Sequence, residues 1–368
     1  MTTPLEIFLV STPGLSEPLR DELVEKSFNV VETNVAGVQI TGDWAAVWRA
    51  NLQIRGATRV LVRVATFRAM HPAQLDKRAR KVDWASVLRP DVPVRVEATT
   101  RKSRIYHAGA AVTRVENALR EVAGITITKD AQIVVKVRID DDLCTISVDT
   151  TGPSLHLRGH KEAVNKAPMR ETMAAMFLRC CGYDGNEPVF DPMCGSGTFP
   201  IEAAEIAAGL YPGRSRSFAF ENLAGFDQAA WSEMKAVKPT TGSELTFYGT
   251  DRDVGAIKMS QQNAERASVS DLVAFQALPI SEAMPPAGQK GLVIVNPPYG
   301  GRIGQKGPLY GLYAAMGAQL MQQFQGWRVG LITTEAGLAK ATGLPLHPPG
   351  PIVAHGGLKI RLWQTGPL

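Results

Sequence analysis

Alternating apolar and polar residues predict the elements of the N-terminal part of the chain. Residues 60–64 alternate between the two faces of a strand, and Leu15, Leu19 and Leu23 form one face of a helix. Asp140–Asp142 predicts a hairpin turn between two further strands. Strands are expected at 5–10, 35–41, 92–98, 133–139 and 143–148, and helices at 44–48, around 77–81 and at 107–122. This mixture predicts an α+β region.

In the C-terminal part, short apolar runs end abruptly at a carboxylate or an amide. One predicted strand ends at Asp191 and a second ends at Asp251. A third, Leu292–Val295, is wholly apolar and ends at Asn296. Buried strands followed by helices are typical of a parallel sheet that is covered on both faces. Such sheets bind ligands at the carboxyl ends of their strands, so these three residues are candidates for a binding site.

Length and composition are consistent with about two domains. The chain has 368 residues, and 45% hydrophobic residues are sufficient for two cores. No apolar run approaches the roughly 18 residues of a membrane-spanning helix, and the N-terminus lacks the pattern of a signal peptide. The four cysteines include no C-x-x-C pair, so a disulfide scaffold, a zinc site and a redox pair are not indicated. We therefore expect a cytoplasmic protein without a metal.

Positive charge is concentrated in one stretch of the N-terminal part. Residues 49–138 contain 19 Lys and Arg against 7 Asp and Glu, although the net charge of the chain is only +5. This excess predicts a polyanionic partner. Aromatic residues are not interleaved with the charges, so we expect recognition of the phosphates and shape of folded RNA rather than base stacking. The candidate RNA-binding residues are Lys77, Arg78, Arg80, Lys81, Arg101, Lys102, Arg104 and Arg114.

Two further basic residues join this group. Lys166 and Arg170 lie near the start of a helix expected from Met169 to Leu178. Positive charge at that end is unfavourable for the helix dipole. Its placement there therefore suggests contact with an anionic ligand.

The residues that follow Asp191 predict a loop that approaches a ligand closely. They read Pro192-Met193-Cys194-Gly195-Ser196-Gly197-Thr198. The two glycines permit positive φ and close approach of the backbone, and Ser196 or Thr198 is expected to cap the next helix. The loop has neither the lysine of a P-loop nor the spacing of dinucleotide-binding enzymes. An acidic residue followed by small ones therefore suggests a cationic nucleoside without phosphates.

The two other strand ends complete this chemistry. Asp251, with Arg252 beside it, is placed to hold a ribose diol. The stretch Asn296-Pro297-Pro298-Tyr299 is stiffened by two prolines that lack backbone donors. The Asn296 side-chain carbonyl and the Pro297 backbone carbonyl can each accept an N–H from an amine on an aromatic ring. Tyr299 can stack on that ring, so together the motifs predict methylation of an exocyclic amine.

These motifs resemble those of class I S-adenosylmethionine-dependent amino-methyltransferases. Other stretches, including Leu155–His160, Lys166–Ala175 and Phe220–Asn222, resemble bacterial THUMP-containing RNA methyltransferases, as do Leu309-Tyr310 and Phe324–Trp327. The resemblance covers nearly the whole chain. It implies an α/β fold with a Rossmann-like methyltransferase domain and a mostly parallel seven-stranded sheet, preceded by an α+β THUMP-containing region.

The resemblance also implies domains, a cofactor and a substrate. The domains are a ferredoxin-like segment at 1–50, a THUMP RNA-binding domain at 51–160 and a methyltransferase domain at 161–368. The cofactor is S-adenosylmethionine, and the acceptor is guanine N2 of 23S ribosomal RNA. The expected cofactor contacts are Asp191, Pro192, Met193, Cys194, Gly195, Ser196, Gly197, Thr198, Asp251, Arg252 and Gln276. The residues expected to hold the base are Asn296, Pro297, Pro298 and Tyr299.

Two positions differ from the family pattern. An acidic residue often follows the third strand and contacts the adenine ring of the cofactor, but Ala274–Pro279 offers only Gln276. Near the C-terminus an Asn-Gly pair is replaced by His355-Gly356-Gly357, which we expect to affect only the final hairpin.

Several other functions share some of these features. A tRNA guanosine methyltransferase would keep both the catalytic motifs and the basic segment, and a DNA adenine methyltransferase would share the catalytic residues. A protein-glutamine methyltransferase also uses Asn-Pro-Pro-Tyr but has no use for the basic segment. A non-catalytic RNA-binding protein with an inactive methyltransferase fold would lose affinity for the cofactor.

Overall fold

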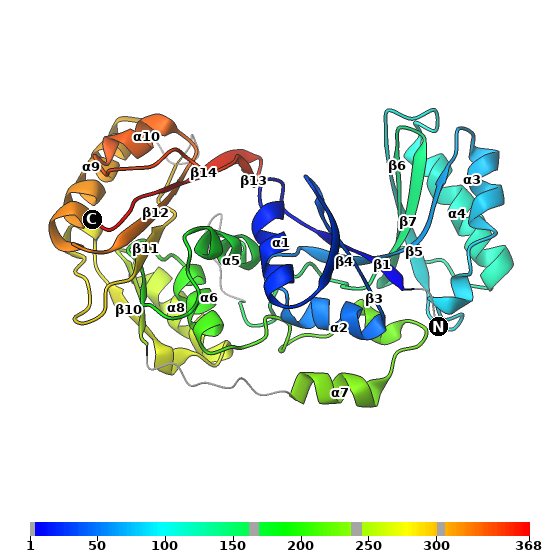
Figure 1. The fold of residues 1–368 in the computed structure, drawn as a ribbon, viewed down its shortest axis with the longest axis horizontal. Coiled ribbons are helices and arrows are strands. Elements are labelled where there is room, and N and C mark those ends of the chain that lie inside the picture. Colours follow the sequence, from blue (N-terminus) through cyan, green and yellow to red (C-terminus); the bar gives the residue numbers. More distant parts are fainter. Residues whose placement is uncertain (1–3, 162–168, 237–244, 300–305) are drawn as a thin grey trace. The chain divides into compact units, whose positions relative to one another are not determined.

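The computed structural model describes residues 4–161, 169–236, 245–299 and 306–368, and it divides into two compact units (Figure 1). The N-terminal unit comprises Met1–Ser11, Arg20–Leu155 and Arg216–Val237. The C-terminal unit comprises Thr12–Leu19, His156–Ser215 and Lys238–Leu368. Both units are thus discontinuous in sequence.

One seven-stranded sheet runs through the N-terminal unit, in the order β2-β3-β1-β4-β7-β6-β5. Only the β5–β6 pair is parallel. The strands are β1 (Leu5–Val10), β2 (Asn29–Asn34), β3 (Gly37–Gly42), β4 (Arg59–Arg68), β5 (Val94–Arg101), β6 (Ile133–Asp140) and β7 (Leu143–Asp149). The main helices along this part of the chain are α1 (Ser16–Glu25), α2 (Trp44–Gln53), α3 (Pro72–Ala79), α4 (Ala108–Ala123) and α7 (Gln228–Ala236).

Local chemistry accounts for most of these elements. Asp43 caps α2 by accepting a hydrogen bond from the backbone N–H of Ala46 at 2.9 Å. The predicted β6–β7 hairpin is confirmed, and Asp141 and Asp142 turn the chain with positive φ. The prediction missed β2 because this edge strand is mostly exposed and has no buried face to produce an alternating pattern. The helix expected around 77–81 ends at Ala79.

The C-terminal unit has a second seven-stranded sheet, in the order β10-β9-β8-β11-β12-β14-β13. All neighbours are parallel except β14, which runs antiparallel to β12 and β13, so the predicted fold class is confirmed. The strands are β8 (Val189–Asp191), β9 (Phe247–Asp251), β10 (Val273–Ala277), β11 (Leu292–Val295), β12 (Arg328–Thr333), β13 (Val353–His355) and β14 (Leu358–Gln364). The helices are α5 (Glu171–Cys180), α6 (Thr198–Ala207), α8 (Val254–Arg266), α9 (Lys306–Gln323) and α10 (Ala336–Ala341).

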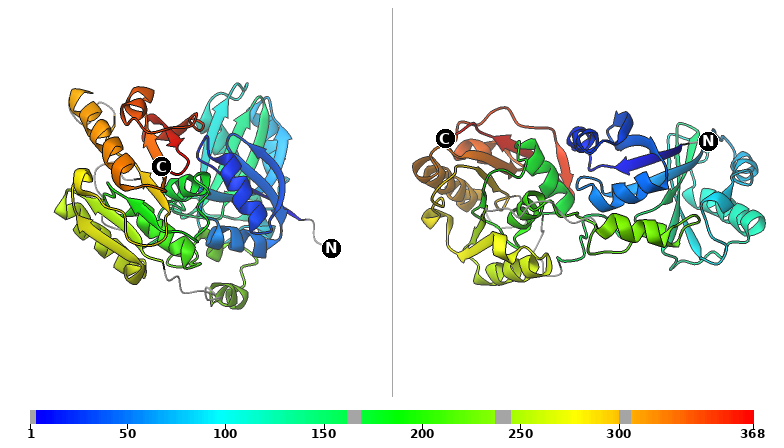
Figure 2. Two further views of the ribbon diagram at one scale, coloured as in Figure 1. Left: turned by 60° about the vertical axis from the view of Figure 1, so that its left-hand side comes forward. Right: turned by 60° about the horizontal axis from the view of Figure 1, so that its bottom comes forward.

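Strand β8 marks the point where the strand order reverses. From β8 the chain proceeds to β9 and β10 on one side, and then returns to β11 on the other. The yellow to red segments of the chain in Figure 2 all belong to the C-terminal unit. The carboxyl ends of β8, β9 and β11 are therefore neighbours, and this is where open α/β sheets bind their ligands. All four residues of β11 are buried, and the α9 residues Tyr313, Met316 and Leu320 belong to the same core. None of the helices in the described ranges combines the length and apolar character needed to cross a membrane.

Candidate active site

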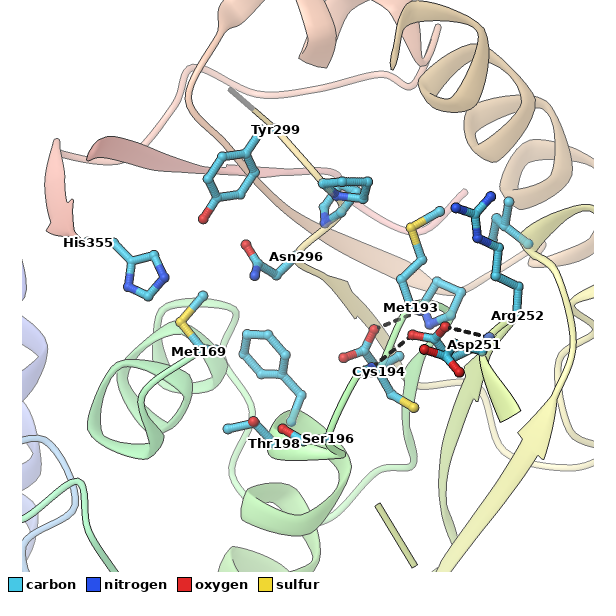
Figure 3. A pocket seen from close by; sticks show the side chains of 18 of the residues that line it. Met169, Met193, Cys194, Ser196, Thr198, Asp251, Arg252, Asn296, Tyr299 and His355 are labelled. Atoms are coloured by element: carbon cyan, nitrogen blue, oxygen red, sulfur yellow. Dashed lines mark hydrogen bonds between the residues drawn. The ribbon is translucent and has the colours of Figure 1, made fainter. Parts of the chain in front are cut away.

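A cavity of about 900 Å³ lies at the carboxyl ends of β8, β9 and β11. This volume is within the range of small-molecule sites. In Figure 3, Met193, Cys194, Asp251 and Arg252 lie on one side of the cavity. Asn296, Tyr299, Met169 and His355 lie on the other. The cavity thus brings together the three strand ends identified in the sequence.

The loop after β8 is held in place by backbone hydrogen bonds. The N–H of Met193 donates to Asp191 Oδ1 at 3.0 Å, and the N–H of Cys194 donates to the carbonyl of Thr250 at 2.9 Å. The N–H of Gly195 donates to Asp251 Oδ2 at 3.0 Å. Since Thr250 and Asp251 belong to β9, the conformation of the loop is fixed by contacts with two adjacent strands as well as by its own sequence.

Two glycines of this loop serve different purposes. Gly195 has a φ of 55°, and a Cβ built there would meet nothing within 4 Å. Gly197 has a φ of 81°, and a Cβ there would lie 3.0 Å from side-chain atoms of Phe275 and Ser260. Gly195 therefore leaves open space beside the cavity, whereas Gly197 is required by backbone conformation and packing.

The expected cap of α6 was wrong. Gly197 occupies the N-cap position, and no side chain accepts a hydrogen bond there. Thr198 is the first helical residue, and its Oγ1 lies 2.8 Å from Lys161 Nζ. The hydroxyl is thus engaged by a lysine in place of the helix backbone.

Asp191 and Asp251 form an electrostatically unusual pair. Asp191 is only 2% exposed, and burial raises its pKa to about 8; the charge of Asp251 adds to this shift, and the N–H of Met193 opposes it. Asp251 accepts from the backbone N–H groups of Gly195 and Asp253, each at 3.0 Å, so its carboxylate is firmly oriented. A buried carboxyl next to a second carboxylate favours a positively charged ligand, because that charge stabilises the ionised form.

The thiol of Cys194 is not suited to act as a nucleophile in this cavity. It is buried, and burial raises its pKa well above the ordinary value, with further contributions from Asp191 and Asp251. A thiol in this environment stays protonated and is a poor nucleophile.

A buried lysine connects the two helix starts that border the cavity. Lys161 Nζ lies 3.0 Å from Glu171 Oε1 and donates to the carbonyl of Met169 at 3.0 Å as well as to Thr198. The side chains of Lys161 and Glu171 are 9% and 8% exposed. The sequence motifs include Glu171, and Lys161 directly follows His160, but no role was predicted for either residue.

Asn296 provides the acceptor expected for an amine. Its Oδ1 is buried and accepts no hydrogen bond within the described part of the chain. Buried polar atoms without partners are rare, so such an oxygen is well suited to bind a ligand. Burial raises the pKa of Tyr299 to about 12, against a smaller lowering by hydrogen bonding with the Asn296 side chain. Tyr299 therefore stays a neutral phenol beside the amide.

Tyr313 supports this stretch from behind. Its hydroxyl lies 3.4 Å from the carbonyl oxygen of Pro298 and 3.2 Å from Thr333 Oγ1. Its side chain is fully buried on α9, and burial raises its pKa above the ordinary value. The sequence shows Tyr313 only as part of the apolar spacing of a helix, which gives no sign of this contact.

Most of the predicted site residues line the cavity. These are Asp191, Pro192, Met193, Cys194, Gly195, Ser196, Thr198, Asp251, Arg252, Asn296, Pro297, Pro298, Tyr299 and Arg170. Gly197 and Gln276 do not line it, and Gln276 is exposed on β10, whereas Pro279, Ile280 and Ser281 after that strand do line it. Lys166 lies outside the described residues.

One expectation about the C-terminus was wrong. His355 and Gly356 line the cavity, so the departure from the family pattern affects the site as well as the final hairpin. The sequence missed this because β13 follows β12 only after an intervening helix and loop. Within the described ranges, no group of three or more His, Cys, Asp or Glu side chains could hold a metal ion.

The predicted RNA-binding residues of the N-terminal unit differ in their surroundings. Arg80 lies 2.8 Å from Asp76 and 2.6 Å from Glu121, so it is neutralised by two carboxylates. The guanidinium of Arg78 lies 5.5 Å from the centre of the Phe67 ring. The exposed members are Lys77, Arg78, Lys81, Arg101, Lys102, Arg104 and Arg114.

The cavity has the features needed for S-adenosylmethionine. Asp191 and Asp251 supply negative charge for a cationic ligand, and the space beside Gly195 leaves the backbone accessible. Ile280 and Met193 provide apolar surface. Asn296 provides the buried acceptor for a second ligand that carries an amine.

Comparison with known proteins agrees with this site. A family model described as RMKL-like, methyltransferase domain matches residues 158–345, and one described as the RlmL ferredoxin-like domain matches residues 6–61. A Synechocystis sp. protein named "Putative RNA methyltransferase slr0064" is 32% identical and is aligned over 96% of this chain and 95% of its own.

Two other relatives extend this comparison. The "Ribosomal RNA large subunit methyltransferase K/L" of Vibrio cholerae is 31% identical over 88% of this chain, which spans about half (48%) of that relative. The crystal structure of "a possible methylase" from Clostridium difficile has a TM-score of 0.92 and 26% identity, covering 100% of this chain and 99% of that one. The chain belongs to the RMKL-like methyltransferase family, which confirms the predicted methyltransferase and its methyl donor, S-adenosylmethionine.

Proposed function

We propose that this protein methylates the N2 amine of a guanine in RNA, and that this RNA is the large-subunit ribosomal RNA. The observation that carries the proposal is the buried Oδ1 of Asn296, which has no partner among the described residues. It lies across the cavity from Asp251, and Asp191 lines the same cavity. An acceptor without a partner on one side and carboxylates on the other suit an amine and a cationic methyl donor, respectively.

Residues of this chain orient the amine. The Asn296 side-chain carbonyl and the Pro297 backbone carbonyl accept the two N–H groups and turn the nitrogen lone pair towards the donor. Tyr299 packs against the base, and Tyr313 holds the Pro298 carbonyl in position. S-adenosylmethionine, when bound, supplies an electrophilic methyl group. Orientation of this kind can contribute up to about 7–11 kcal/mol.

The target base must be accessible to a cavity at the end of a sheet. A base inside a duplex cannot reach such a site, so the guanine is unpaired or flipped out before reaction. The cost of removing it from the helix is least in loops and other single-stranded regions. This requirement favours a structured RNA with exposed bases as substrate.

The choice of RNA rests on the relatives and on the N-terminal unit. The K/L relative is named for large-subunit ribosomal RNA, and this chain spans about half of it. The excess of Lys and Arg at 49–138 is consistent with a polyanion, and our assignment of 51–160 as a THUMP domain is part of the proposal. A cytoplasmic location, where ribosomal RNA is made and assembled in bacteria, is part of it as well.

The decisive experiment maps modified nucleosides by mass spectrometry in RNA from cells that lack the gene. We expect loss of one N2-methylguanosine in large-subunit RNA, restored by the wild-type gene and not by Asn296→Ala. Loss confined to tRNA would support the tRNA alternative, and loss of N6-methyladenine from DNA would overturn the RNA assignment. Purified protein with labelled methyl donor, offered naked RNA, assembling particles and DNA, tests the same assignment directly.

A further inference from the structure

Tyr106 is an aromatic residue that the N-terminal unit does not use for its own core. It is 83% exposed, more than any other large apolar or aromatic side chain among the described residues. It lies between β5 and α4, two residues after Arg104 and close in sequence to Arg101 and Lys102. An exposed tyrosine next to three cations departs from our expectation that aromatic residues are not interleaved with the charges.

The loop that carries Tyr106 is anchored to the protein on both sides. Thr100 Oγ1 donates to the carbonyl of Tyr106 at 2.9 Å. The loop therefore leaves β5 and folds back onto the C-terminal end of that strand. The backbone N–H of Arg104 donates to Asp142 Oδ1 at 2.7 Å, which ties the loop to the β6–β7 turn (Figure 1). Ile105, between Arg104 and Tyr106, is only 3% exposed and anchors the segment in the core. The exposed side chains are therefore presented by an ordered backbone.

Further cations lie at the same end of the sheet. Arg68 ends β4, and its guanidinium donates to the carbonyl of Asp141 at 3.2 Å. Lys102 adopts a left-handed conformation with a φ of 47°, which is unfavourable for a lysine and persists only where surrounding contacts hold it. The side chain of Arg104 is 68% exposed, and the nearest approach to the Asp142 carboxylate is 4.0 Å.

Three carboxylates, those of Asp140, Asp141 and Asp142, lie at the adjacent β6–β7 turn. Arg138 holds the pKa of Asp140 below its ordinary value by a side-chain hydrogen bond, and the charges of Arg101 and Lys102 add to this. Asp142 accepts the backbone N–H of Arg104. Five cations, Arg68, Arg101, Lys102, Arg104 and Arg138, thus outnumber the three carboxylates near Tyr106, and this excess of positive charge suits a phosphate chain.

We infer that Tyr106, with Arg68, Arg101, Lys102 and Arg104, forms a binding site for single-stranded RNA, in which an unpaired base stacks on the tyrosine ring. The inference rests on the proposed function, since it assigns part of the RNA contact to this loop. An exposed aromatic ring flanked by cations is the arrangement by which proteins hold unpaired bases, with the ring contacting the base and the cations contacting the phosphates. Recognition in the N-terminal unit therefore combines base stacking with phosphate contacts.

The test measures the affinity of the full-length protein for a labelled single-stranded RNA of about ten nucleotides, within the site sizes of single-strand binders. A duplex of the same strand and a DNA of the same sequence serve for comparison at one salt concentration. Tyr106→Ala is expected to weaken binding of the single strand about tenfold, whereas Tyr106→Phe, which keeps the ring, binds as the wild type. Binding of the duplex should be unchanged in both variants.

Two controls separate stacking from charge and from general surface effects. Arg104→Ala should reduce the dependence of log affinity on log salt by about 0.7, whereas Tyr106→Ala should leave that slope unchanged because it removes no charge. Val35, 82% exposed in the same unit, provides the matched control, since Val35→Ala should bind both RNAs as the wild type. Thermal unfolding verifies that each variant is folded.

The outcomes distinguish this inference from the proposed function. If the wild type binds single-stranded RNA and Tyr106→Ala binds it equally well, only the stacking site is disproved. If the wild type prefers DNA or binds no RNA, the RNA assignment and the site are both overturned. Equal losses for the single strand and the duplex would show that Tyr106 does not contact an unpaired base.

Discussion

The carboxyl edge of the C-terminal sheet and the basic surface of the N-terminal unit use polar residues in opposite ways. At the sheet edge, Asp191, Asp251 and Asn296 are held by the ends of three adjacent strands, and backbone N–H groups orient both carboxylates. On the basic surface, the exposure and ion pairing of each side chain vary from residue to residue. Arg80, at the C-cap of α3, is bound by two carboxylates, whereas Lys77 within that helix is exposed.

This difference shows where position in the chain is informative. A polar residue at the end of a buried parallel strand has few alternative orientations, because topology places it at the ligand edge. A surface cation can contact RNA, a neighbouring carboxylate or only water, and the sequence does not distinguish these cases. The following predictions test the contrast, beginning with the largest expected effect.

Asn296→Ala should lower kcat/KM by about 100- to 1000-fold, because it removes the acceptor that orients the amine. Calorimetry should show that the affinity for S-adenosylmethionine changes by less than about threefold. A large loss of kcat/KM with nearly unchanged cofactor affinity would place Asn296 on the substrate side of the cavity. A comparable loss of cofactor affinity would contradict that role.

Asp251→Ala should weaken cofactor binding about ten- to a hundredfold, because the variant lacks the charged acceptor that we expect to hold the ribose. Asp253→Ala is the matched control, since Asp253 also lines the cavity but caps α8 by accepting from Gly255 N at 2.8 Å. This control should lower the free energy of unfolding by about 1 kcal/mol and leave cofactor affinity nearly unchanged. Equal losses of affinity in the two variants would argue against a specific role for Asp251.

Cofactor affinity should rise with pH until the pKa of Asp191, about 8, is reached. Below that pH the free protein holds a proton on Asp191, and binding of a cationic ligand must release it. Cofactor affinity should rise by at most about tenfold per pH unit and reach a plateau above pH 8. In Asp191→Asn this dependence of affinity on pH should be absent. A flat profile in the wild type, measured by calorimetry, would show that the protonation of Asp191 does not change when the cofactor binds.

The raised pKa of Asp191 also predicts how this residue makes the stability of the fold depend on pH. In the unfolded chain Asp191 ionises near its ordinary value of 3.8, but in the folded protein without cofactor it ionises near 8. The stabilising contribution of Asp191 to the free energy of unfolding is therefore fully present below pH 3.8 and is lost as pH rises to 8. Urea unfolding of the wild type and of Asp191→Asn at several pH values isolates this term.

The smallest effects are expected from single cations on α3 and at its C-cap. Lys77→Ala should reduce the salt dependence of RNA binding by about 0.7–0.9 in log–log slope, since it removes an exposed charge. Arg80→Ala should change the slope less, because Asp76 and Glu121 already neutralise this residue. Filter binding over a range of salt concentrations compares the two. Identical slopes would mean that ion pairing does not determine which cations reach the RNA.

The sequence by itself determined the secondary structure around the site and the chemistry of the three strand ends. Apolar runs that stop at Asp191, Asp251 and Asn296 predicted buried parallel strands, and the sheet order confirms that fold class. These predictions succeeded because hydrophobic periodicity and strand-end chemistry are local properties, and because the carboxyl ends of neighbouring parallel strands must meet.

Only the tertiary structure showed which residues complete the cavity. Lys161 reaches Glu171 and Thr198 across the fold, Tyr313 supports Pro298 from α9, and His355 enters from the last hairpin. The replacement of a side-chain cap by Gly197 and the exposure of Tyr106 were likewise invisible in the sequence. Such contacts depend on how distant elements pack, and neither periodicity nor motif spacing encodes which side chains meet when those elements come together.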